Sequence, residues 1–140
     1  MEYLYALLAF PLASWVLYYF LVYRKKPWKC KGKWDPRSMT PEQFEAYTAH
    51  WLSKHWRRNV KVTAHVKDGG KDVVAWKRRK KYYIECKRYT NSTVGVAIVR
   101  SIYWVAQADW VKAGLAYVWK LSKDARKFAD KNKVLLLDFN

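Results

Sequence analysis

A run of 21 residues without a charged side chain, from Tyr3 to Tyr23, constrains this chain more than any other feature. As an α-helix it would span about 31 Å, which is enough to cross the hydrocarbon core of a bilayer. Arg24, Lys25 and Lys26 follow at once, and the positive-inside rule places the C-terminal side of such a helix in the cytoplasm. The sequence therefore predicts a transmembrane helix over residues 3–23. The expected localisation is the membrane, with a single pass and a cytoplasmic C-terminal domain.

Two other interpretations of the same run fit the sequence less well. A cleaved signal peptide has a basic segment before a shorter apolar core, and a small-residue cleavage pattern after it. Here Glu2 precedes the run, the basic cluster follows it, and no Ala-x-Ala pattern comes next. A buried helix of a soluble domain is seldom this long without a charge. A retained anchor is favoured, followed by a basic linker over residues 24–38, where Pro27, Gly32 and Pro36 interrupt any helix.

The charge balance indicates a polyanionic partner. The 140 residues include 28 Lys and Arg against 11 Asp and Glu, a formal net charge of +17. Such a balance suits nucleic acid or an anionic membrane surface. A hydrophobic content of 51% excludes a disordered basic tail. The two cysteines have no metal-ligand or disulfide-framework spacing, and the three histidines are scattered, so neither a zinc site nor a disulfide scaffold is expected.

Residues 39–140 are expected to form one α/β domain with elements in the order α-β-β-β-α-β-α-β. Thr40 and Gln43 have the spacing of a capping box and predict a helix start, and Gly114 is expected to end a later helix. Residues 90–93 are expected to form a polar loop. The predicted strands cover 60–66, 72–76, 82–89, 115–121 and 134–137. Three helices are predicted: one that begins near Thr40, one over 94–113, and one that begins after Ser122. This order describes a mixed sheet with helices packed against it.

An acid at the start of one predicted strand and an acid-x-lysine triplet in the next form the candidate site. Glu85 and Lys87 would project from one face of their strand, with Cys86 pointing away, and a hairpin could bring Asp72 beside them. Hard divalent cations held by carboxylates neutralise charge at a phosphodiester. Asp72, Glu85 and the Cys86 carbonyl are the candidate ligands for Mg²⁺ or Mn²⁺. Lys87 is the candidate for positioning the attacking water.

Glu-x-Lys alone is a weak signal, because most such triplets are solvated strand faces. Its setting strengthens it here. The triplet is embedded in apolar and aromatic residues, where an unpaired charge is costly, and it follows Asp72 across one hairpin in a basic domain.

The combined pattern resembles the catalytic core of the Mrr-type restriction endonuclease family, within the wider PD-(D/E)xK nuclease group. The resemblance covers residues 39–139 in the family's order. It is carried by residues 68–74, Tyr83-Ile84-Glu85-Cys86-Lys87-Arg88-Tyr89, Phe44-Glu45, Val94-Gly95-Val96, residues 123–129 and Leu135-Leu136-Leu137-Asp138. It implies a restriction-endonuclease-like fold and a metal-dependent DNA endonuclease. Asp72 and Glu85 would then be metal ligands, Lys87 the catalytic lysine, and Glu45 an accessory acid from the first helix, against the alternative that Glu45 is solvated.

Two features depart from that family's pattern. Many members carry Gln where this chain has Glu85, although Glu fits the wider group and keeps both carboxylates. We find no separate DNA-recognition domain, which leaves sequence specificity open, and the membrane anchor would limit substrates to DNA near the membrane. A double-strand cut would most simply need two active sites, hence a homodimer.

The basic residues Lys77, Arg78, Arg79, Lys80 and Lys81, at a predicted hairpin tip, and Arg88 are the candidate DNA contacts. The alternatives for the tip are a membrane-surface contact or a simply solvated turn. Four tryptophans, Trp76, Trp104, Trp110 and Trp119, are expected in the core rather than as base-stacking platforms. Three other functions stay open: a non-catalytic DNA- or membrane-binding module on this fold, a structure-selective nuclease for junctions or flaps, and an RNA nuclease.

Overall fold

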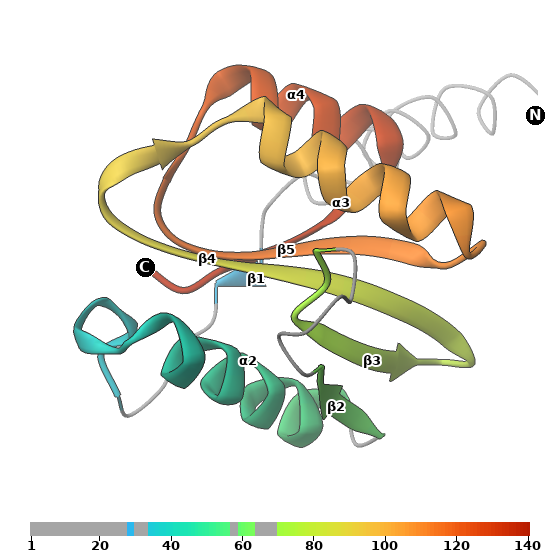
Figure 1. Cartoon of the computed structure of the whole chain (residues 1–140), viewed down its shortest axis with the longest axis horizontal. Helices are drawn as coiled ribbons and strands as arrows, with labels where there is room; N and C mark the ends of the chain where they lie inside the picture. The colour runs from blue at the N-terminus through green and yellow to red at the C-terminus, as the bar shows by residue number, and fades with distance from the viewer. Residues whose placement is uncertain (1–27, 30–33, 57–58, 64–69) are drawn as a thin grey trace, which may run out of the picture.

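The computed structural model describes residues 28–29, 34–56, 59–63 and 70–140 (Figure 1). The predicted transmembrane helix over residues 3–23 lies outside these residues. Within the described part of the chain, no helix is both long and apolar enough to cross a membrane.

Six strands in the described residues form one mixed sheet in the order β1-β6-β5-β4-β3-β2. β2, β3 and β4 pair antiparallel, whereas β4, β5, β6 and β1 pair parallel. The predicted order α-β-β-β-α-β-α-β is confirmed from α2 to β6. The strands are β1 (Trp28–Lys29), β2 (Val60–Val62), β3 (Val73–Lys77), β4 (Lys80–Val94), β5 (Lys112–Leu121) and β6 (Leu135–Asp138), and the helices are η1 (Pro36–Ser38), α2 (Pro41–Trp56), α3 (Val96–Ala108) and α4 (Lys123–Asn132).

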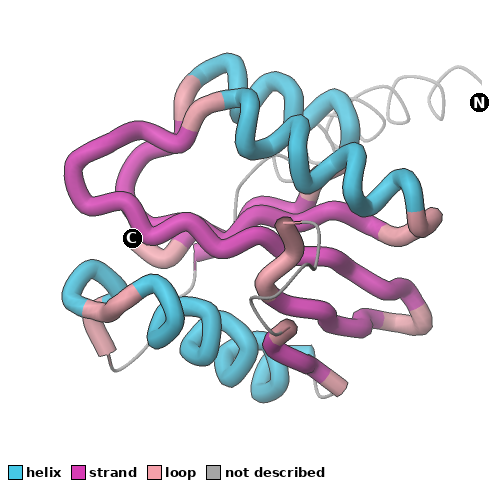
Figure 2. Tube along the Cα trace, in the orientation of Figure 1, coloured by secondary structure: helices cyan, strands magenta, loops and turns pink. Residues whose placement is uncertain are grey.

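Helices cover both faces of the sheet, α2 on one side and α3 with α4 on the other (Figures 1 and 2). Side chains alternate along β4, so Ile84 and Cys86 join the core under α2 while Tyr83 joins the core under α3 and α4. β5 lies between both layers and is buried from Ala113 through Val118. A strand buried on both faces is apolar throughout, which explains the continuous hydrophobic run.

The predicted helix starts at Thr40 and Ser122 are confirmed by their caps. The Thr40 hydroxyl accepts from the Gln43 N–H at 3.2 Å, and the Gln43 side chain accepts from the Thr40 N–H at 2.8 Å. The Ser122 hydroxyl accepts from the Ala125 N–H at 3.1 Å. These local contacts satisfy helix N–H groups that have no partner within the helix.

The middle of the chain differs from the prediction in three places. Residues 90–93, predicted as a loop, belong to β4, which pairs with β5 again beyond an irregularity between Arg88 and Thr93. α3 is shorter than the predicted helix over 94–113. Gly114 lies inside β5 and does not end the helix; a Cβ there would lie 3.1 Å from Ile84 Cγ1, so glycine permits the close approach of β4 and β5.

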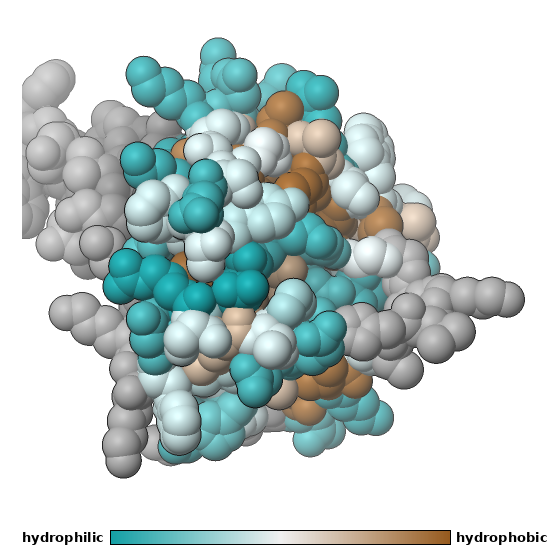
Figure 3. Space-filling view, turned by 60° about the vertical axis from the view of Figure 1, so that its left-hand side comes forward, coloured by the Kyte–Doolittle hydropathy of each residue, from teal (hydrophilic) through white to brown (hydrophobic). Residues whose placement is uncertain are grey.

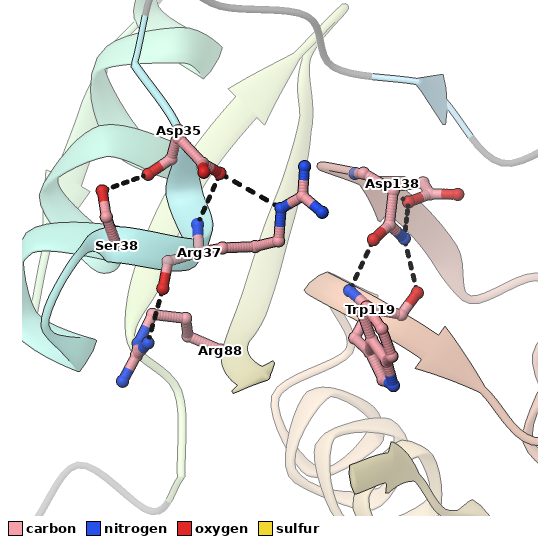
Figure 4. A network of polar contacts seen from close by, with 7 residues as sticks. Asp35, Arg37, Ser38, Arg88, Trp119 and Asp138 are labelled. Carbon is pink, nitrogen blue, oxygen red and sulfur yellow. Dashed lines mark hydrogen bonds and ion pairs between the residues drawn. The ribbon is translucent and has the colours of Figure 1, made fainter. Parts of the chain in front are cut away.

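The predicted linker also contains structure, because β1 and η1 lie within residues 24–38. Arg88 Nη1, on β4, donates to the Arg37 carbonyl of η1 at 3.0 Å (Figure 4). The same view shows Trp119 beside the C-terminus, where the Asn140 side chain bonds both backbone groups of Trp119. The folded unit therefore begins before residue 39.

Candidate functional site

Four hydrogen bonds fix Asp72 at the entry to β3, one of them from the Thr63 hydroxyl to the Asp72 carbonyl at 3.1 Å. Its N–H donates to the Ile84 carbonyl at 3.0 Å, and its carbonyl accepts from the Thr63 N–H at 2.9 Å. Its carboxylate oxygen Oδ2 accepts from the Cys86 N–H at 2.7 Å. The last bond joins the acid to the middle of the Glu85-Cys86-Lys87 triplet, so the hairpin brings the sequence-predicted residues together.

Glu85 and Lys87 form an ion pair on one face of β4. Lys87 Nζ lies 2.6 Å from Glu85 Oε1, and the two side chains are 31% and 13% exposed, respectively. Cys86 lies in the core under α2, as the alternation predicts. Gly70 passes close to this pair: a Cβ on it would lie 3.7 Å from Glu85 Oε2, and its φ of +81° is a backbone conformation that suits glycine.

The electrostatics of the pair follow from burial and from Asp72. Burial raises the pKa of Glu85, the hydrogen bond from Lys87 opposes this shift, and the charge of Asp72 adds to it. Burial lowers the pKa of Lys87, but the hydrogen bond and charge of Glu85, together with the Asp72 charge, outweigh it and raise that pKa above its ordinary value. The lysine is therefore held in its charged form beside two acids.

Glu45 occupies a different position from the other acids. It is buried on α2, 6% exposed, on the sheet face that also holds Cys86. Burial, and after it the charge of Asp72, raises the pKa of the Cys86 thiol well above its ordinary value; Glu45 and Glu85 add smaller contributions, and the Thr48 hydroxyl opposes them. Glu45 thus lies near Cys86, on the face of β4 opposite Glu85 and Lys87. Its role as an accessory acid stays a prediction.

The donor set at Asp72 and Glu85 suits a hard divalent cation. Two carboxylates here share a partly buried setting, and the charge of one makes ionisation of the other harder. A bound cation would relieve that repulsion, and Mg²⁺ commonly takes one or two carboxylates and keeps several waters. Within the described residues, no three His, Cys, Asp or Glu side chains are grouped closely enough to hold a metal. The protein would thus supply two carboxylates, with the Cys86 carbonyl as a predicted further ligand.

The predicted DNA-contact residues lie at two places. Arg78 and Arg79 form the turn between β3 and β4, and Lys77 and Lys80 pair across it. Burial lowers the pKa of Lys77, and the positive charge of Arg78 lowers it further. Arg88 lies away from this tip and donates to Arg37, so one of its donors is used within the chain. Arg57 and Arg58, which add charge nearby in the sequence, lie outside the described residues.

A basic surface that the sequence interpretation did not single out lies on α4. A hollow of about 470 Å³ is lined, among the described residues, by Lys123, Arg126, Lys127, Asp130 and Lys131. These positions recur at helical spacing and therefore share one side of α4. In Figure 3, hydrophilic side chains line the top edge of the molecule, where α3 and α4 lie in Figure 1, and others lie at mid-height and below.

The prediction that four tryptophans lie in the core is wrong for three of them. Trp110 is 94% exposed, Trp104 65% and Trp119 36%, while Trp76 is partly buried against the core under α3 and α4. Trp110 is exposed because α3 ends at Ala108, so the residue leaves the helical face on which it was predicted. The tie between Tyr83 and Asp109 was also missed, and no local signal could have found it, because 26 positions separate the two residues.

Comparisons with known proteins agree with this architecture. A family model described as Restriction endonuclease, Mrr_cat, matches residues 36–140. A solved structure titled "Crystal Structure of Protein of Unknown Function AF1548" is similar at a TM-score of 0.60 and 21% identity, over 71% of this chain and 58% of that one. This chain thus spans little more than half of that protein, and at such identity the likeness shows the fold alone. A search of curated proteins found no significant match.

Proposed function

This chain belongs to the Mrr_cat restriction endonuclease family, and from that premise we propose that it is a metal-dependent endodeoxyribonuclease with Asp72, Glu85 and Lys87 at its active site. The observation that carries the proposal is the grouping of the three residues around Cys86. The Lys87–Glu85 ion pair of 2.6 Å adjoins a backbone N–H that holds Asp72 at 2.7 Å. An acid pair with a charged lysine, in a nuclease-family domain, supports phosphodiester hydrolysis.

Asp72 and Glu85 would hold Mg²⁺ or Mn²⁺. Such a cation neutralises charge on the phosphate and stabilises the leaving oxygen. The Cys86 N–H orients the Asp72 carboxylate, and the backbone of Gly70 lies beside Glu85 Oε2. Glu85 must be ionised to hold a cation, and its raised pKa makes that dependent on pH.

Lys87 acts in its protonated form. Its raised pKa keeps the ammonium charged at neutral pH, so it donates hydrogen bonds to the attacking water or to a phosphate oxygen and does not remove a proton. Its ion pair with Glu85 sets the direction of the ammonium before substrate binds. The negative charge that develops on the phosphate during attack is then stabilised by the Lys87 ammonium, which is already in place.

DNA would be held by the basic surface. Lys77, Arg78, Arg79, Lys80 and Lys81 supply five cations around one hairpin, and Arg88 adds a sixth with its remaining donors. Contacts of this kind bind the phosphate backbone without reading sequence. A homodimer would place two active sites on one duplex, as a double-strand cut requires.

We propose a membrane location on sequence grounds. Residues 3–23 would form a single transmembrane helix, and residues 24–38, which include β1 and η1, would connect it to the nuclease domain of residues 39–140 on the cytoplasmic side. The enzyme would then act on DNA that reaches the inner face of a membrane, in restriction of foreign DNA or in processing of DNA there.

The test is cleavage of supercoiled plasmid by the full chain with Mg²⁺ or Mn²⁺ and with EDTA. We expect nicking or linearisation with metal only, lost in Asp72→Ala and in Lys87→Ala. Lys54→Ala, at an exposed lysine of α2, is the matched control and should retain cleavage. Folded protein that binds DNA but cleaves no plasmid, junction or flap substrate would instead indicate a non-catalytic binding module.

A further inference from the structure

Trp110 is the most exposed large hydrophobic residue in the described part of the chain. It is 94% exposed and follows α3 directly. Its N–H donates to the Gln107 carbonyl at 3.1 Å, and the Val111 N–H donates to the Ala106 carbonyl at 2.9 Å. These two bonds close the helix end, so the indole is carried by a defined turn.

The backbone at this turn is unfavourable for a tryptophan. Trp110 has a φ of +56°, the left-handed conformation that glycine usually supplies where a helix ends. A residue with a side chain loses stability in this conformation. Burial could offset that loss, but an indole 94% exposed gains almost none from within the chain. The side chain is therefore costly to folding where it stands, and strain of this kind is concentrated at functional positions.

A basic aromatic cluster fixes the residue before it. The Tyr83 hydroxyl donates to Asp109 Oδ2 at 2.6 Å, which ties the turn to β4. Lys71 Nζ and Lys81 Nζ lie 4.4 and 5.0 Å from the centre of the Tyr83 ring, and Lys81 also donates to the Tyr83 hydroxyl at 3.4 Å. Trp110 thus directly follows Asp109. The Asp109 carboxylate is bonded to Tyr83, whose ring lies beside the ammonium groups of Lys71 and Lys81.

The same cluster leads to the acid pair. Tyr83 is two residues from Glu85 on β4, and alternation places both on one side of the strand. Lys71 directly precedes Asp72. The cations and Trp110 are therefore linked through Tyr83 to β4, the strand that carries Glu85 and Lys87 of the proposed active site. A surface that served only membrane contact would have no need of this connection.

We propose that Trp110 is a stacking platform for an unpaired base of the DNA bound at the active site, with Lys71 and Lys81 holding neighbouring phosphates. This inference rests on the proposed function and extends it to a substrate class, DNA with unstacked bases such as single strands, flaps or junctions. An exposed indole on a fixed turn can stack on any base, and lysines beside it attract the backbone.

Binding is measured with the full chain in EDTA, so that cleavage does not enter, by fluorescence anisotropy of a labelled single strand, a blunt duplex and a flap. Trp110→Gly should weaken single-strand and flap binding by about tenfold and duplex binding by much less. Trp110→Phe keeps a ring and should restore most of the affinity. Trp104→Ala removes the other exposed tryptophan of this region and should change binding less than about twofold.

Thermal unfolding separates this role from a structural one. Because glycine suits the positive φ, Trp110→Gly should unfold at the same temperature as the wild type or a higher one. A lower unfolding temperature, or equal loss of affinity for duplex and single strand, overturns the inference. So does a Trp110→Gly chain that loses only its binding to phosphatidylserine vesicles, which would make the residue a membrane contact.

Plasmid cleavage distinguishes failure of this inference from failure of the proposed function. Unchanged single-strand binding by Trp110→Gly, with metal-dependent cleavage lost in Asp72→Ala, overturns the stacking role alone. If Trp110→Gly weakens single-strand binding but the wild type cleaves nothing, the stacking role is supported and the proposed nuclease function is overturned.

Discussion

Asp72 has two effects that substitution can separate. Its carboxylate accepts from the Cys86 N–H at 2.7 Å, and its charge acts on Glu85. Asp72→Asn keeps an acceptor but removes the charge, so we expect cleavage to be lost while the free energy of unfolding changes by less than about 0.5 kcal/mol. Asp72→Ala also leaves the N–H without its partner and should cost about 1–3 kcal/mol. Urea unfolding and plasmid cleavage measure the two effects. Cleavage retained by Asp72→Asn would exclude Asp72 as a metal ligand.

Glu85 should make the stability of the protein depend on pH in a defined direction. Burial raises its pKa, the hydrogen bond from Lys87 opposes this shift, and the Asp72 charge adds to it. Ionisation is therefore harder in the folded state, and the free energy of unfolding should fall as pH rises from the ordinary glutamate pKa of 4.5 through the raised one. Lys87, whose raised pKa lies above 10.5, stays charged in this range. Glu85→Gln should lose this decline in urea unfolding as the pH rises above 4.5. An equal decline in both proteins contradicts the assignment.

At the scale of elements, the turn of the β3–β4 hairpin combines an unfavourable backbone conformation with two positive charges. Arg78 and Arg79 have φ values of 47° and 66°, the pattern of a two-residue turn that favours Asn-Gly. The double variant Arg78→Asn/Arg79→Gly should raise the free energy of unfolding by about 1 kcal/mol. If both arginines contact phosphates, the slope of log K for DNA against log salt should fall by about 1.8. Anisotropy titrations at several salt concentrations measure this. The control Arg78→Lys/Arg79→Lys keeps both charges and should keep the salt slope. An unchanged slope in Arg78→Asn/Arg79→Gly would exclude the hairpin tip from the DNA interface.

Elements differ in how far the sequence alone determines them. The start of α2 was predictable because Thr40 and Gln43 are three residues apart and satisfy each other. Asp72, Glu85 and Lys87 were predictable because one hairpin and strand alternation place them. The far end of β4 was not, because its pairing at Thr93 depends on Lys120 in β5. The exposure of Trp110 followed from where α3 ends, which a long-range contact with β4 through Tyr83 helps to set.

At the scale of the whole molecule, the described part of the chain forms two hydrophobic cores. Both hydrophobic cores, one on each face of the sheet, draw their described residues from Met39 to Phe139. Among the described residues before Met39, β1 adds two residues to the edge beside β6, and the Arg37 carbonyl of η1 accepts from Arg88 of β4. A chain that begins at residue 28 keeps this edge and both cores. It should therefore fold and retain metal-dependent cleavage in solution.

The proposed anchor and the basic charge predict different modes of membrane binding. The full chain and a chain of residues 28–140 are floated with phosphatidylserine vesicles at low and high salt. Both should float at low salt, because the basic residues are attracted to an anionic surface. At about 1 M salt the Debye length falls to about 3 Å, so the shorter chain should be released, whereas a transmembrane helix stays inserted. Replacing two leucines of the uncharged run, Leu7 and Leu8, by lysine provides the control, because charges inside the bilayer are costly. Release of the full chain at high salt would overturn the anchor and leave electrostatic attraction as the basis of binding.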